Sequence, residues 1–190
     1  MKTKTGNLCL ALFVGFLTVA TINMTGCAGD RYSRSTGEYI DDNSLKVRVY
    51  QALRDNPDYK FGSVTVTAFK GTVQLNGFVD LGDQKSQAEE IVKGTEGVRS
   101  VINNLSVNSP GNRTTGENAD DKWLISHVKS ALAHNPDYKF DEVIVTASRG
   151  TVQLSGFVNT ADQKSKAADV AQAVPGVKDI ENSITVKDKM

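Results

Sequence analysis

The chain has 190 residues, of which 39% are hydrophobic and 23% charged, and its 22 basic residues balance 22 acidic ones. A nucleic-acid-binding protein usually carries a basic excess or a basic patch, so this balance argues against that class. With two cysteines, one of them inside an apolar run near the amino terminus, the chain has no disulfide framework and no thiolate metal site.

The amino terminus has the pattern of a signal peptide rather than of a folded element. Lys2 and Lys4 precede an apolar run over residues 8–22, which is shorter than the roughly 20 residues that a membrane-spanning helix needs. Residues 24–27 then read Met-Thr-Gly-Cys, which resembles the lipobox of bacterial lipoproteins. We therefore predict a lipoprotein signal peptide over residues 1–26, with an ordinary secretory signal or an uncleaved anchor as the alternatives.

The lipobox resemblance implies that Cys27 is lipidated and becomes the first residue of the mature protein. Residue 28 is Ala rather than Asp, which in such lipoproteins implies export to the outer membrane. The resemblance therefore places the protein on the periplasmic face of that membrane, anchored by lipid. Residues 27–40 lack apolar periodicity and are predicted to form a tether. Removal of residues 1–26 leaves 20 basic and 22 acidic residues, a formal charge of −2.

The rest of the chain is an internal repeat with an offset of 79 residues. The hexapeptide Asn-Pro-Asp-Tyr-Lys-Phe occurs at 56–61 and again at 135–140, and roughly half of residues 41–107 are identical to their partners. A period of this length is too long for a solenoid unit and is typical of a small domain used twice. We predict one domain over 41–107, a polar linker over 108–119 and a second domain over 120–187.

Each repeat is expected to begin with an amphipathic helix. In the first copy Leu45, Val49 and Leu53 share one helix face, and the Asn-Pro pair ends the helix because the residue before proline disfavours the helical region. The paired acids at 41–42 and 120–121 are predicted to cap this helix and to interact with its dipole.

Two alternating strands, a second helix and a third strand follow in each copy. A two-residue hairpin turn joins the first two strands at Lys70-Gly71 and at the equivalent Arg149-Gly150. Asp80 and Asn159 are predicted to cap the second helices. Each copy therefore reads α-β-β-α-β, an α+β fold in which two helices cover one face of a three-stranded mixed sheet. Domains this small are marginally stable alone, so docking of the two copies would stabilise both.

Two short motifs carry a family resemblance. Gly-Thr-Val-Gln-Leu-x-Gly occurs at 71–77 and 150–156, and Gly-Val-x-x-(Val/Ile)-x-Asn occurs at 97–103 and 176–182. Together with the order of elements, they resemble the BON domain of bacterial envelope proteins over residues 41–187. Two BON domains behind a lipobox are similar to the tandem-BON lipoproteins of the outer membrane. The resemblance implies binding of anionic phospholipid through the first helix of the second domain, and support of envelope integrity under envelope or osmotic stress.

The chain contains no motif that indicates catalysis, and no cofactor is predicted. It lacks the nucleophile elbow, the zinc-protease helix motif and the P-loop lysine motif. Its two histidines, His127 and His134, are seven residues apart on one predicted helix, a rise of roughly 10 Å that is too long for a shared metal. We predict a protein that is not an enzyme and has no metal site.

The positions at which the two copies differ point to one helix face. Ser44, Lys46 and Arg48 of the first copy become Trp123, Ile125 and His127 in the second, which widens the apolar surface beyond the shared stripe. Tryptophan is a natural interfacial anchor, because its apolar ring carries one N–H donor. The resemblance implies a tryptophan at this place in the lipid-binding helix. The predicted phospholipid-binding residues are Trp123, Ile125, Lys122, Lys129 and His127.

Other interpretations of the same helix face remain open at this point. Trp123 and Ile125 would also suit the interface between the two domains, an edge of the core, or the docking of an envelope protein partner. His127 gains positive charge in mild acid, which would favour an anionic surface; an ordinary surface histidine is the alternative.

Overall fold

The computed structural model describes residues 34–58, 60–108, 115–136 and 139–187, so the predicted signal peptide and the lipidation of Cys27 lie outside the described residues. The first copy comprises α1 (Thr36–Arg54), β1 (Val64–Phe69), β2 (Thr72–Val79), α2 (Gly82–Lys93) and β3 (Ser100–Val107). The second comprises α3 (Thr115–Ala133), β4 (Val143–Ser148), β5 (Thr151–Val158), α4 (Ala161–Gln172) and β6 (Asp179–Val186).

The predicted α-β-β-α-β order and the mixed sheet are confirmed in both copies. The sheet orders are β1-β2-β3 and β4-β5-β6, with an antiparallel hairpin followed by a parallel pair. The hairpin turns have the left-handed backbone expected of a two-residue turn, with φ of 50° at Lys70 and 81° at Gly71. A parallel partner requires a crossover, and the second helix of each copy supplies it.

The helix stripes and one set of alternating strand residues form the two cores, as predicted. In the first copy Val49, Val73, Leu75 and Val92 are fully buried, and the equivalent positions of the second copy are buried as well. Phe140, from the repeated hexapeptide, joins the second core, whereas Tyr59 and Tyr138 lie outside the described residues.

The first helices begin earlier than predicted, which changes the role of the paired acids. α1 starts at Thr36, where Ser35 and Glu38 form a reciprocal capping box. Asp42 is therefore inside the helix, and its buried carboxylate accepts the backbone N–H groups of Lys70 and Gly71 at 2.9 and 3.1 Å. Asp121 accepts the equivalent pair at 3.0 and 3.2 Å. Asp42 and Asp121 therefore do not cap the helices. Each of them holds the hairpin turn of its domain against the helix.

The caps of the second helices also differ from the prediction by one residue. The residue before α2 is Leu81 and the one before α4 is Thr160, so Asp80 and Asn159 lie outside the helices. The Gln84 side chain accepts the backbone N–H groups of Asp80 and Leu81 at 2.9 and 3.1 Å. The side chain that satisfies the N–H groups before α2 is therefore the glutamine at the third helical position, and Asp80 is not the cap.

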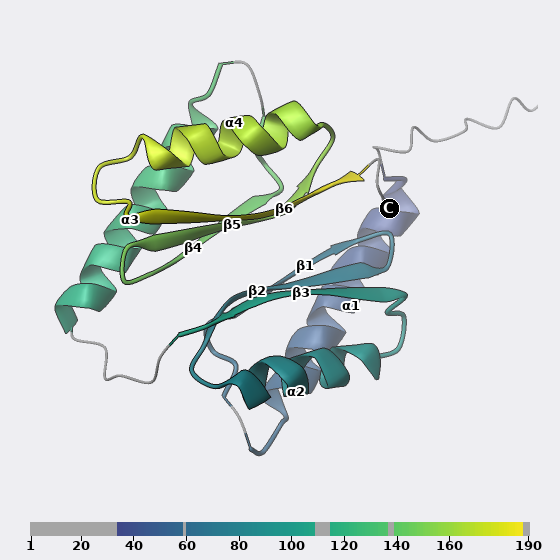
Figure 1. The fold of residues 1–190 in the computed structure, drawn as a ribbon. Helices are drawn as coiled ribbons and strands as arrows, with labels where there is room; N and C mark the ends of the chain where they lie inside the picture. The colour runs from purple at the N-terminus through teal and green to yellow at the C-terminus, as the bar shows by residue number, and fades with distance from the viewer. Residues whose placement is uncertain (1–33, 59, 109–114, 137–138, 188–190) are drawn as a thin grey trace, which may run out of the picture.

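The two sheets pack against each other, with the helices on the outer sides (Figure 1). Gln74 and Gln153 occupy equivalent central positions and are completely buried. The Oε1 atom of Gln153 accepts the Gly77 N–H at 2.6 Å, and that of Gln74 accepts the Gly156 N–H at 2.7 Å. This reciprocal exchange makes the domain interface nearly two-fold symmetric, and it satisfies polar groups that would be costly to bury unpaired.

The repeated glycines of β2 and β5 are required by close backbone approach. Gly77 has a φ of 113°, and a Cβ atom on it would lie 2.2 Å from the Ser63 carbonyl oxygen. Gly156 has a φ of 109° and an equivalent contact at 2.0 Å with the carbonyl oxygen of Glu142. No side chain fits at either position.

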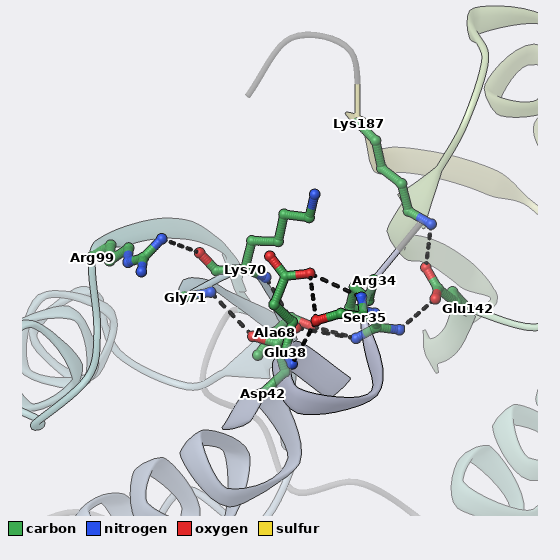
Figure 2. Close-up of polar contacts among 10 residues, drawn as sticks. All are labelled: Arg34, Ser35, Glu38, Asp42, Ala68, Lys70, Gly71, Arg99, Glu142 and Lys187. Atoms are coloured by element: carbon green, nitrogen blue, oxygen red, sulfur yellow. Dashed lines mark hydrogen bonds and ion pairs between the residues drawn. The ribbon is translucent and has the colours of Figure 1, made fainter. Parts of the chain in front are cut away.

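One end of the domain interface is closed by a cluster of charges around Arg34 (Figure 2). The Arg34 guanidinium donates to the Asp42 carboxylate at 3.3 Å, to the Ala68 carbonyl oxygen at 3.2 Å and to Glu142 of the second domain. Lys187 forms an ion pair with the same Glu142 at 2.8 Å. The last residues of the predicted tether, from Arg34 onward, therefore belong to the folded protein. The same holds for the last residues of the predicted linker, where α3 begins.

Candidate functional site

Trp123 lies in the first half of α3, on the outer side of the second domain. Its side chain is 46% exposed, while its neighbour Leu124 is buried in the core. α3 packs on β4 and α4 of its own domain (Figure 1). The residues that surround the Trp123 side chain all belong to the second domain, so Trp123 is not part of the interface between the domains. That alternative is wrong, and Trp123 presents an aromatic surface to the solvent.

The Trp123 ring is held in place by its neighbours. It stacks on the His127 ring with a centroid distance of 3.7 Å and an interplanar angle of 23°. His127 Nδ1 lies 2.9 Å from the Trp123 carbonyl oxygen, which requires the proton on Nδ1 because a carbonyl only accepts. The loop before β6 also approaches the ring, since a Cβ atom on Gly176 would lie 3.9 Å from Trp123 Cζ3. The Trp123 ring is therefore exposed to solvent, while its neighbours fix its orientation.

The remaining predicted residues lie on the opposite flank of α3. Successive residues turn by about 100°, so Lys122, Ile125 and Lys129 lie together while Trp123 and His127 lie together on the other side. Ile125 is half-buried against the core, and both lysines are exposed. Lys129 lines a pocket near the end of α3 that does not include Trp123. The structure thus divides the predicted site into an aromatic flank and a basic flank.

A pocket of about 250 Å³ opens beside Trp123, where α3 meets the β4–β5 turn and the loop before β6. Its walls combine an apolar side with charges of both signs. The lining residues are Glu117, Asp120, Asp121, Trp123, Leu124, Arg149, Gly150, Gly176 and Lys178.

The charged groups of this pocket differ in whether they already have a bonding partner. The Asp121 carboxylate is occupied by the two N–H groups of the hairpin turn, and Arg149 lies 3.9 Å from Glu117. The Lys178 stem lies over the turn, since a Cβ atom on Gly150 would be 2.8 Å from Lys178 Cδ. In the part of the chain that the structure describes, Lys178 forms no ion pair. Its ammonium group is therefore available at the pocket.

The first domain has an equivalent pocket without the aromatic wall. Ser44 replaces Trp123, and Arg48 replaces His127 and donates to the Glu96 carbonyl oxygen at 3.2 Å. Arg99, the counterpart of Lys178, donates to the Lys70 carbonyl oxygen at 3.5 Å (Figure 2). The Ser35 backbone N–H donates to the Glu38 carboxylate and lowers the pKa of that group. Both arginines of this pocket are therefore bonded to backbone carbonyl oxygens, and the Lys70 ammonium group lies over the Phe69 ring.

Sequence reasoning missed Arg149 and Lys178 as site residues. Both lie far from Trp123 in the chain, and the fold brings them to it. A signal was present, because both copies carry a basic residue at these two places, Lys70 and Arg99 in the first. Within the described residues there is no cluster of three or more potential metal ligands. Nor is any described helix long and apolar enough to cross a membrane.

Comparison with known proteins agrees with this arrangement of domains. The model of the BON domain family matches residues 41–109 and 120–188. The chain is 32% identical over 158 residues to osmotically-inducible protein Y of Escherichia coli K12, covering 83% of this chain and 79% of that one. It is 36% identical over 148 residues to the outer membrane lipoprotein DolP of Haemophilus influenzae, covering 77% and 75%.

A third relative is the 21 kDa hemolysin of Actinobacillus pleuropneumoniae, with 32% identity over 145 residues that cover 76% of this chain and 73% of that one. Each of these relatives matches across most of both chains, and the family model matches both repeats separately. The chain therefore belongs to the BON domain family and carries two BON domains in tandem.

Proposed function

We propose that this protein is a lipid-anchored envelope protein, without enzymatic activity, that binds anionic phospholipid through the exposed face of α3. The observation that carries the proposal is Trp123, an exposed aromatic ring on the outer helix of the second domain, where the first domain has Ser44. An exposed indole has an apolar face and an N–H donor, which suits the boundary between headgroups and acyl chains.

The geometry of α3 supports contact with a membrane surface. Ser126 and Ser130 are exposed along its outward line, with Trp123 on one side and Lys122 and Lys129 on the other. A helix lying on a membrane would insert the ring and place both ammonium groups near lipid phosphates. His127 would stay beside the ring, and Ile125, half-buried against the core, would contribute least.

The relatives support an envelope location and a role under stress. One is named as an outer membrane lipoprotein and another as osmotically inducible. Cys27, in its lipobox-like setting, would supply the anchor on the periplasmic face of the outer membrane. Because Cys27 is seven residues before Arg34, the tether would hold the folded domains within roughly 25 Å of the membrane surface.

Flotation with vesicles tests the proposal. The chain from residue 28, which keeps every residue that the structure describes, would be mixed with vesicles of phosphatidylcholine with or without phosphatidylglycerol. We expect binding only with the anionic lipid. Insertion of the exposed part of the ring removes roughly 100 Å² from water, worth about 2.5 kcal/mol at most. Trp123→Ser should therefore weaken binding about tenfold or more.

The matched control is Val47→Ser, which removes a 56% exposed apolar side chain from α1 of the first domain. This control should bind vesicles as the unchanged chain does. Equal binding to neutral and anionic vesicles, or equal loss in both variants, would refute the proposal. Docking of an envelope protein partner through α3 would then be the better account, because it requires no particular headgroup.

A further inference from the structure

The pocket beside Trp123 has features that a flat membrane contact does not require. It is hollow, at about 250 Å³, and its mouth lies where α3, the β4–β5 turn and the loop before β6 meet. This volume is below the usual range for pockets that hold drug-sized ligands, and it suits a small polar group. A whole lipid would not fit, whereas one headgroup would.

The wall groups that remain available define the chemistry of the ligand. Lys178 contributes an ammonium group without an ion-pair partner among the described residues, which suits a phosphate oxygen. Asp120 is exposed at the same pocket and contributes a carboxylate, which accepts a hydrogen bond from a donor. Asp121 and Arg149 are engaged with the turn and with Glu117. Lys178 and Asp120 together therefore match a ligand that has both a phosphate and a hydroxyl group.

The first domain has the same fold but lacks the combination of an available cation and an aromatic wall. Its equivalent pocket has the same acids, Glu38, Asp41 and Asp42. However, its Arg99 and Arg48 donate to backbone carbonyl oxygens, and the ammonium group of its third cation, Lys70, lies over the Phe69 ring. The aromatic wall is also absent there. The available cation and the indole occur together in the second domain alone.

We propose that the Trp123 pocket binds the headgroup of one anionic phospholipid whose phosphodiester carries a hydroxylated alcohol, as glycerol does. The Lys178 ammonium group donates to the phosphate, and the Asp120 carboxylate accepts a hydroxyl hydrogen of the alcohol. Trp123 then lies beside the glycerol backbone and enters the membrane. This inference rests on the proposed function, and it adds the choice of headgroup to it.

The test compares two anionic lipids of equal charge, phosphatidylglycerol and phosphatidylmethanol, of which the second has no hydroxyl group in its headgroup. The chain from residue 28 should bind phosphatidylglycerol vesicles about fivefold more tightly, as expected from one added charge-assisted hydrogen bond. Lys178→Ala should lose about tenfold on phosphatidylglycerol, whereas its counterpart Arg99→Ala should change binding less than about twofold. Asp120→Ala should remove the preference between the lipids, and its counterpart Asp41→Ala should keep it.

The outcomes distinguish failure of the headgroup pocket from failure of anionic lipid binding through α3. Equal binding to both anionic lipids, or equal losses in Lys178→Ala and Arg99→Ala, would overturn the headgroup pocket while anionic lipid binding through α3 stood. Binding to neither anionic lipid would overturn both. Glycerol phosphate that bound without vesicles as tightly as the lipid would show a soluble ligand and overturn the lipid assignment. All four side chains are exposed, and circular dichroism would verify that each variant is folded.

Discussion

Replacement of Gln153 by methionine tests whether the two domains are held together as described. Gln153 is fully buried between the sheets. Its Oε1 atom accepts the Gly77 N–H at 2.6 Å, and its Nε2 donates to the Asn104 carbonyl oxygen at 2.7 Å. Methionine has nearly the same shape but makes neither bond. Two buried backbone groups of the other domain would then lack partners.

The size of the loss follows from these two groups. Each unpaired buried backbone group costs about 1–3 kcal/mol, so the loss of both partners in Gln153→Met should lower the free energy of unfolding by roughly 2–6 kcal/mol. That is a large part of the roughly 5–15 kcal/mol that stabilises a typical protein. Urea unfolding of the chain from residue 28 would measure it, with a midpoint lower by about 1–2 M. Gln74→Met should behave alike, because Gln74 makes the reciprocal bond to Gly156.

The control for this experiment is Gln51→Met, the same change on the exposed side of α1. It should alter the free energy of unfolding by less than about 0.5 kcal/mol. If Gln153→Met were no more destabilising than Gln51→Met, the reciprocal glutamine interface would not exist in solution, and the docking of the two sheets would have to be abandoned.

Three further predictions concern the framework that positions the site. Asp121→Asn should lower the free energy of unfolding by about 1–3 kcal/mol in a thermal melt, since the two turn N–H groups bind different oxygens of the carboxylate and an asparagine would place its NH2 donor against one of them. Gly77→Ala should cost more than about 3 kcal/mol or abolish folding, because its Cβ would lie 2.2 Å from a backbone oxygen, while Gly82→Ala, with open space around it, should be tolerated. Hydrogen bonds from a lysine and an asparagine side chain lower the pKa of Glu89, so its contribution is present near neutral pH and is lost as the pH falls through the lowered folded pKa. Glu89→Gln should therefore be less stable than the unchanged protein at pH 7 and equal to it in strong acid, as measured by urea unfolding at several pH values.

The parts of the fold that depend on local pattern could be predicted from the sequence. Leu45 and Val49 recur at helical spacing and Val73 and Leu75 at strand spacing, and all four are buried where these spacings place them. The Lys70-Gly71 turn followed from turn chemistry alone. Such features need only neighbouring residues for their definition.

The parts that depend on distant partners could not be predicted in the same way. Alternation places Gln74 on the sheet face away from the helices, which normally indicates a solvated position, yet the second domain buries it. The sequence pattern predicts a helix cap at Asp42, because its bond to a turn 28 residues away has no local signature. The sequence does contain a signal for the start of α1. The pattern Arg-x-Thr-Gly-Glu recurs at 34–38 and 113–117 with the same offset of 79 residues, so the repeat extends upstream of residue 41.

The candidate site shows the same division. Trp123 stood out because its counterpart is Ser44, whereas Lys178 reaches the same pocket only through the loop before β6. Helix periodicity predicts that Ile125 and Trp123 flank the buried stripe on opposite sides, and the structure adds that Ile125 is half-buried against the core.

The most direct test of membrane binding through α3 uses the fluorescence of Trp123, which is the single tryptophan of the chain. Its ring is 46% exposed in the free protein, so its emission should begin at a long wavelength. Titration with phosphatidylglycerol vesicles should shift the emission to shorter wavelength and protect it from a water-soluble quencher, while phosphatidylcholine vesicles should leave both unchanged. Emission and quenching that stayed the same with anionic vesicles, although the protein floated with them, would show that another surface binds the lipid and would contradict the assignment of Trp123.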